Sequence, residues 1–242
     1  MKKLLLTFLT VSLLMAFFCQ PLSAEGDKLR VGVLRFTNQT AAGWWSGSVA
    51  TELSDMLASE LVSTRAFSVL ERNEIDAVLG EQDLSASDRV SAKTKVQMKK
   101  LKGAQYLIAA TVSAYEDDVS GKKGGIAFKG LSLGGGKNKA YLAVDLKVID
   151  TETGEIVDAR TIEATAKGSA LEAGLSIRNF SVGGESYKKT PTGKAIRACI
   201  VYIAEYLECS MVKGKDDDCM EKWDEMESKR KEKTKDSIDI DD

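Results

Sequence analysis

The chain has 242 residues, of which 43% are hydrophobic and 29% charged, so it can form one globular domain with appendages. Its formal net charge is −2, and it lacks the basic stripe with interleaved aromatic residues that is typical of nucleic-acid-binding proteins. It contains no histidine, the commonest general base and metal ligand, so we expect no catalytic residue, no metal site and no cofactor.

The first 24 residues have the pattern of a bacterial secretory signal. Two lysines precede an uncharged run from Leu4 to Phe18, and small residues before Ala24 suit a signal peptidase, so we expect cleavage between Ala24 and Glu25. The run is shorter than the roughly 20 residues of a transmembrane helix, and no later run approaches that length. The expected mature protein is therefore exported and has no transmembrane helix.

The first half of the mature chain alternates strands and helices. Residues 29–36 form a compact apolar run that predicts a buried strand. A long amphipathic helix is expected next, with one apolar face made of Val49, Leu53, Met56, Leu57 and Leu61. Residues 67–72 predict a short strand that leads into a helix, which we expect to bury Ile75, Val78 and Leu79. The polar stretch 81–95 shows no periodicity.

The second half adds strands joined by tight turns. Residues 106–115 predict an extended segment, and Leu142, Val144, Leu146 and Val148 alternate with polar residues as in a strand with one buried face. Residues 150–155 predict a turn, with Gly154 supplying the positive φ, and a further strand begins at Ile156. The expected fold is α/β (α+β), a mixed sheet flanked by helices with antiparallel strands at one end.

The C-terminal part is expected to be helical and then increasingly charged. Pro191 opens a helix from about Thr192 to Met211, with Ala195, Cys199, Ile203 and Tyr206 along one stripe. Residues 220–233 predict a solvated helix, and 236–242 a disordered acidic tail that is a solubilising end and not a calcium loop.

Two further segments do not fit an ordinary small domain. Residues 120–140 are rich in glycine. Between 167 and 194, Leu171, Ala173, Leu175 and Ile177 alternate with polar residues, and the phase changes near Asn179. The change of phase predicts a β-hairpin for the second segment.

The cysteines do not suggest catalysis. Cys199 and Cys209 are expected on one helix, where ten residues rise about 15 Å and exclude a mutual disulfide. Cys219 lies beyond a turn and can reach back to Cys209. We expect inert thiols, with that one bridge as the alternative and no zinc pattern.

The order of several blocks resembles the curli production assembly/transport family (CsgG-like), which are outer-membrane secretion channels of bacteria. The matching blocks are Leu53–Leu57, Phe67–Arg72, Gly103–Ile108 and Asp150–Ile156, and their succession covers more than half of the mature chain. No single block is specific by itself.

The resemblance implies a homo-oligomeric ring that exports unfolded or fibre-forming polypeptides, and possible accessory secretion proteins as further partners. A periplasmic domain, residues 25–211, would carry two hairpins at about 112–142 and 160–190 that join those of neighbouring subunits in one transmembrane β-barrel. Leu171, Ala173, Leu175 and Ile177 would then face lipid. Residues 212–242 would form a charged C-terminal extension.

The family narrows its pore with a loop between the first strand and the long helix. Here the loop contains Thr40, Trp44 and Trp45, and only Trp45 falls where the family carries an aromatic residue. The alternative is that Trp44 and Trp45 staple the start of the helix or seal a subunit interface.

Two functions therefore remain open on the sequence. The leading hypothesis is a non-enzymatic outer-membrane export channel facing the periplasm, and the alternative is a soluble periplasmic adaptor or envelope assembly factor on the same fold. Curli-building members are lipoproteins, whereas Phe17 and Phe18 before Cys19 are poor at the small positions that lipidation requires. We therefore expect cleavage after Ala24 in place of lipidation at Cys19.

Overall fold

The computed structural model describes residues 28–87, 89–117, 127–128, 131–132, 139–167 and 190–236. The predicted signal with Ala24 and Glu25, the candidate lipid-facing residues 171–177, and the tail 237–242 lie outside this part of the chain. The elements are β1 (Leu29–Val33), β2 (Thr37–Asn38), α2 (Gly47–Thr64), β3 (Phe67–Leu70), α3 (Ile75–Ala86), β4 (Tyr106–Asp117), β5 (Ala127–Phe128), β6 (Leu131–Ser132), β7 (Lys139–Asp150), β8 (Ile156–Lys167), α4 (Pro191–Leu207), the π-helix η2 (Glu208–Lys213) and α5 (Cys219–Asp236).

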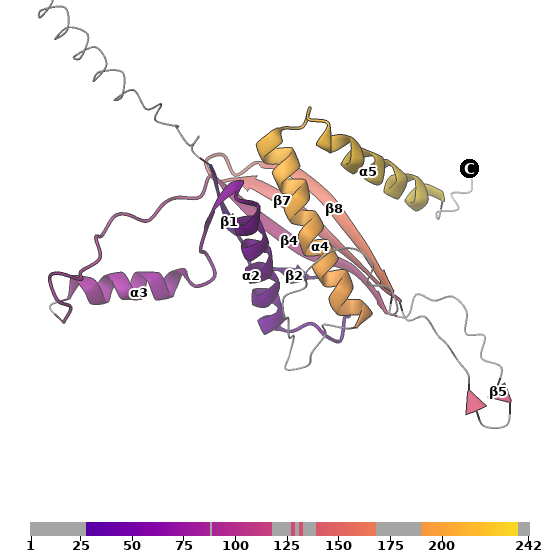
Figure 1. Ribbon diagram of the computed structural model, residues 1–242, viewed down its shortest axis with the longest axis horizontal. Helices are drawn as coiled ribbons and strands as arrows, with labels where there is room; N and C mark the ends of the chain where they lie inside the picture. The colour runs from indigo at the N-terminus through magenta and orange to yellow at the C-terminus, as the bar shows by residue number, and fades with distance from the viewer. Residues whose placement is uncertain are drawn as a thin grey trace, which may run out of the picture.

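A mixed six-stranded sheet forms the body of the domain, as the sequence predicts. Its order is β3-β1-β4-β7-β8, with β2 paired to β4. The strand β1 pairs in parallel with β3 and with β4, and β2 pairs in parallel with β4. The pairs β4–β7 and β7–β8 are antiparallel. Figure 1 shows α2 and α4 side by side on one face of this sheet, while α3 stands apart and α5 lies at the β8 side.

The long helix α2 begins and ends where its local sequence allows. Ser46 caps it by accepting a hydrogen bond from the backbone N–H of Val49, and the helix ends at Arg65, whose φ is 60°. The predicted apolar face is confirmed, because Val49, Leu53, Leu57 and Leu61 are all buried. Met56 is partly buried at the margin of the core.

The core lies between this helix pair and the sheet. The alternation predicted for β7 is confirmed, since Leu142, Val144, Leu146 and Val148 are buried. The predicted stripe of α4 is buried too, and consists of Ala195, Cys199, Ile203 and Tyr206. Gly154 has the predicted positive φ, 76°, in the turn between β7 and β8.

The register between β4 and β7 shifts at one position. Val112 pairs with Val144, but the next aligned pair is Ala114 with Ala143, which leaves Ser113 as the extra residue of a β-bulge. The bulge exchanges the two faces of the strand, so that Tyr115 joins the helix-covered side and packs against the core.

The helix α3 forms where the sequence predicts a helix, but its expected burial is wrong. Ile75 and Val78 are only partly buried, and Leu79 is 42% exposed. The physical reason is visible in Figure 1, where α3 and the segment that returns from it project away from the sheet. The helix also continues to Ala86, into a stretch for which no helix was expected.

The C-terminal helix α5 is less solvated than predicted. Met220 and Trp223 are buried, and Trp223 meets the rings of Tyr202 and Tyr206 edge-on. Arg160 of β8 donates hydrogen bonds to the Trp223 carbonyl and to Asp224. Thus α5 lies along β8, the last strand of the sheet. None of the helices in the described ranges combines the length and the apolar character needed to cross a membrane.

Candidate functional site

One end of the sheet, which we call the hairpin end, carries the bases of both candidate hairpins. Asp117 of β4 pairs with Ala140 of β7, and Lys139 pairs with Lys167 of β8. Residues 118–138 therefore leave and return between neighbouring strands. The chain leaves again after Lys167 and re-enters at Thr190, where α4 begins. Parts of the candidates, 112–117, 139–142 and 160–167, belong to the sheet itself.

The described part of the first candidate contains a short antiparallel pair. Ala127 pairs with Ser132 and Phe128 with Leu131, which makes β5 and β6 antiparallel partners. This pairing is what a hairpin tip requires. The alternating residues 171–177 of the second candidate lie outside the described residues.

The loop between β2 and α2 also lies at the hairpin end and is fixed by its own hydrogen bonds. The Asn38 side chain accepts from the backbone N–H and the hydroxyl of Thr40 and donates to the Thr40 carbonyl. The Thr40 hydroxyl in turn accepts from the Ala42 N–H, and the Gln39 N–H donates to the Val112 carbonyl, 2.9 Å away. Thr40 therefore holds the shape of the loop.

The two tryptophans of this loop pack against the core next to β4. Trp44 meets the ring of Tyr115 edge-on at 5.4 Å and that of Trp45 at 5.8 Å. Tyr115 is hydrogen-bonded to Thr192 at the start of α4. Trp44 thus contacts the end of β4 through Tyr115, which in turn is bonded to the start of α4. Trp45 lies beside it and is partly exposed.

Ser54 is a positioning residue that the sequence did not reveal. It is fully buried on α2, its hydroxyl accepts from the Phe36 N–H at 3.0 Å, and it lies within donating distance of the Leu34 and Ala50 carbonyls. This contact ties the chain between β1 and β2 to α2, and so sets where the loop begins. A serine inside an amphipathic helix gives no distinctive signal, since an exposed serine would look the same.

Glu52 is a second residue without a sequence signal. Burial, assisted by the negative charge of Asp55, raises the pKa of its carboxyl. Its Oε2 atom is buried without a hydrogen-bond partner among the described residues.

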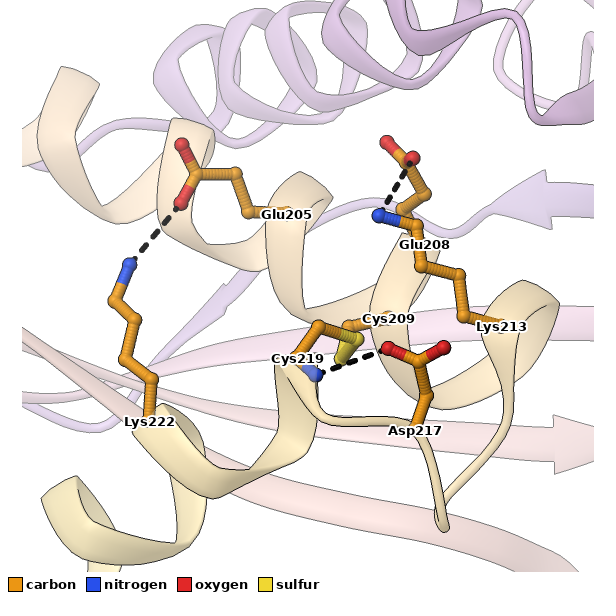
Figure 2. The surroundings of a disulfide bond; sticks show 7 residues. All are labelled: Glu205, Glu208, Cys209, Lys213, Asp217, Cys219 and Lys222. Carbon is orange, nitrogen blue, oxygen red and sulfur yellow. Dashed lines mark hydrogen bonds and ion pairs between the residues drawn. A yellow bond between two sulfur atoms is a disulfide. The ribbon is translucent and has the colours of Figure 1, made fainter.

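Figure 2 shows the Cys209–Cys219 disulfide at the corner between η2 and α5. The favoured interpretation of inert thiols is thus wrong for these two residues and the alternative holds, because the π-helix η2 turns the chain so that the two Cα atoms lie 6.0 Å apart. Asp217 accepts a hydrogen bond from the Cys219 N–H. Although these three side chains cluster, both sulfurs are bonded to each other and offer no thiolate to a metal.

Cys199 remains a free thiol in the core. Burial is the main cause that raises its pKa, with a smaller contribution from Glu163, so it stays protonated at ordinary pH. Its sulfur lies 3.7 Å from the Leu142 carbonyl oxygen. The expectation of an inert thiol is consistent with this environment.

A comparison with known families gives a match over nearly the whole chain. The model of the curli production assembly/transport component CsgG matches residues 17–238. Curated proteins of that name from Escherichia coli (strain K12) and Salmonella typhimurium (strain LT2) are each 24% identical over 166 residues. These alignments cover 64% of this chain and 59% of each relative, so the chain spans less than two thirds of the relatives' length.

Solved structures are only distantly similar. The hypothetical protein CT253 from Chlamydia trachomatis is 14% identical with a TM-score of 0.44, covering 75% of this chain and 96% of that one. The PelC dodecamer from Paraburkholderia phytofirmans is 12% identical with a TM-score of 0.38, covering 74% and 83%. At these values the likeness carries no argument about assembly or activity.

Proposed function

Because the chain belongs to the CsgG family of curli production assembly/transport components, we propose that it is a non-enzymatic export channel of the bacterial envelope. In this proposal identical subunits form a ring in the outer membrane, and unfolded or fibre-forming polypeptides leave through its centre. The observation that carries the proposal is that the strand ends from which both candidate hairpins leave lie at the same end of one sheet as the aromatic loop.

This arrangement matters because the membrane-crossing segments and the constriction loop of a channel must lie on the same face of the subunit ring. The strand β4 leads into residues 118–138, which return at β7, and β8 leads into residues 168–189, which return at α4. In the proposal both segments continue the direction of the strands that precede them. Residues 118–138 and 168–189 would cross the membrane beside those of the next subunit. The apolar side chains of Leu171, Ala173, Leu175 and Ile177 would face lipid, and the polar residues between them would face water.

The aromatic loop would narrow the channel with one side chain per subunit. Trp44 is held by Tyr115 and is suited to anchoring the loop. Trp45 lies next to this anchor and, like Trp44, is partly exposed; in the proposal it supplies the constriction. Such a band of tryptophan side chains would admit an extended polypeptide and exclude a folded protein.

The test is the behaviour of the protein extracted from outer membranes in detergent. We expect ring-shaped particles that conduct ions in planar bilayers, and Trp45→Ala rings with a larger conductance because the constriction is lost. Val62→Ala, a change at an exposed residue of α2, is the control and should leave the conductance unchanged. Monomeric protein found only in the soluble periplasm would contradict the proposal.

A soluble periplasmic adaptor is the second candidate, and one observation favours it. Lys122, Lys123, Lys129 and Lys137 crowd the first segment, where few residues are large and apolar. Limited proteolysis of native membranes separates the two candidates. Free cleavage within residues 120–140 and 170–190 supports the adaptor, and protection of both segments supports the channel.

A further inference from the structure

Exposed apolar side chains gather at two places away from the hairpin end. Ten large apolar side chains are exposed in the described part of the chain, and eight of them lie in two groups. The first group, on α3 and the segment after it, is Leu79, Leu84, Val96, Met98 and Leu101. The second, at the start of β8 and on η2, is Ile156, Val157 and Val212. Apolar surface that is left open in this way is typical of a contact with another molecule.

Val96, Met98 and Leu101 of the first group lie on residues 89–102, which follow the acidic helix α3 and which we call the basic arm. The basic arm has no acidic residue and carries Arg89, Lys93, Lys95, Lys99, Lys100 and Lys102. Residues 91–102 are exposed throughout. Its base is fixed to the domain, because Arg30 donates to the Gly103 carbonyl and Arg72 to the Lys102 carbonyl.

The second group lies beside a set of carboxylates, and we call this region the acidic corner (Ile156, Val157 and residues 212–218). Lys215 donates to the Val157 carbonyl and lies 3.9 Å from Asp158, while Lys213 lies 3.5 Å from Glu208. The lysines of the corner are therefore engaged with groups outside the run Asp216–Asp218. Within the described residues, Asp216 and Asp218 form no ion pair.

The disulfide gives the acidic corner a fixed shape. Figure 2 shows the bond joining η2 to the first residue of α5, with Asp217 turned toward the Cys219 N–H. The exposed carboxylates on either side of Asp217 are thereby presented on a closed loop of the chain. A preorganised surface loses less conformational entropy when a partner binds.

The two surfaces lie on opposite sides of the subunit. The basic arm projects from the side of the sheet that holds β3 and β1, and the acidic corner lies at the start of β8 and at the turn between α4 and α5 (Figure 1). Four strand spacings separate β3 from β8, about 19 Å at the usual 4.8 Å each, and the arm points away from the corner. The two surfaces are therefore separate within one subunit.

We propose that the basic arm of one copy docks onto the acidic corner of the next copy. Val96, Met98 and Leu101 would pack on Ile156, Val157 and Val212, and the lysines of the arm would pair with Asp216 and Asp218. Contact between two arms is disfavoured by their like charge, so the same pair of surfaces repeats from copy to copy in one direction. A head-to-tail contact of this kind generates a ring when its rotation closes. This inference rests on the proposed function, because the interface contributes to the proposed ring.

Charge reversal tests the contact in the full chain extracted from membranes. Lys93→Glu with Lys95→Glu, or Asp216→Lys with Asp218→Lys, should each lower the fraction of protein in rings about tenfold or more, because like charges then meet. All four changes together should restore the rings. Lys233→Glu with Lys235→Glu, an equal change of charge near the end of α5, should leave the ring fraction unchanged. Wild-type rings should also weaken as salt rises, because screening shortens the range of exposed charges.

A cross-link measures the same contact directly. Cysteines introduced at Lys95 and Asp216 in one chain should be joined between subunits by a short bismaleimide, giving a ladder of multimers on denaturing gels. The proposed interface is refuted if rings persist equally in both charge-reversed variants. It is also refuted if intact rings of the cysteine variant give no cross-linked multimers. Rings that form and respond to the reversals but do not conduct overturn the channel proposal and support the interface.

Discussion

Reduction of the Cys209–Cys219 disulfide should release α5 while the sheet stays folded. The bond closes a loop with a sequence separation of ten residues. Loop-closure entropy for that length is worth about 2.7 kcal/mol at 25 °C, which corresponds to about a 100-fold change in the opening equilibrium of α5. The remaining attachments are the burial of Met220 and Trp223 and the contacts of Arg160.

Limited digestion with trypsin measures this opening. α5 carries Lys222 in its first turns and five further basic residues between 229 and 235. When opening and closing are fast, the cleavage rate follows the equilibrium fraction of opened helix. Reduced protein should therefore be cut within α5 up to about 100-fold faster than oxidised protein, with a parallel change in Trp223 fluorescence.

Two controls separate this effect from general unfolding. Cleavage after Lys147, which lies in the middle of β7, should remain slow in both states because the sheet does not open. The variant Cys209→Ala with Cys219→Ala should be cut at the reduced rate with or without reductant. Equal cleavage of α5 in oxidised and reduced wild-type protein would refute the reasoning.

Two more predictions concern single side chains in the core. Ser54→Ala leaves the Phe36 N–H without its acceptor and should lower the free energy of unfolding by about 1 to 3 kcal/mol, measured by urea denaturation. Ser63→Ala, at an exposed hydroxyl on the same helix, should change it by less than about 0.5 kcal/mol. Burial and the hydrogen bond to Asp158 raise the pKa of Tyr206 to about 12. The folded protein then holds this proton more tightly than the unfolded chain, so the free energy of unfolding should fall as the pH rises from about 10 to 12. The variant Tyr206→Phe should lose that part of the pH dependence. An unchanged fall in stability at alkaline pH in the variant would contradict the prediction.

Helices and strands could be predicted with their buried faces where other elements of the same subunit cover those faces. The alternation of Leu142 to Val148 and the stripe from Ala195 to Tyr206 each specify both the element and its buried side. The same reasoning identified α3 but misjudged its burial. An amphipathic spacing predicts a helix but does not indicate which part of the protein covers its apolar face. Within the described subunit no element covers Leu79.

Features that depend on distant parts of the chain were harder to predict. The contact of Trp44 with Tyr115 joins residues far apart in sequence, and spacing alone left stapling and pore narrowing equally open. The disulfide required the turn of η2, which a cysteine spacing of ten does not reveal. Ser54 and Glu52 differ from ordinary helix residues only in what lies against them.

The bulge at Ser113 has a consequence for how such domains can vary. It lies between the part of β4 that pairs with β1 and β2 and the part that leads to the hairpin end, and it changes which side chains face the helices. Residues inserted in pairs beyond Tyr115 would keep the alternation of both halves of β4, so the segment between β4 and β7 can change in length without repacking the core. Relatives with longer or shorter segments should therefore keep the same interior, and grafting a segment between them should preserve the fold.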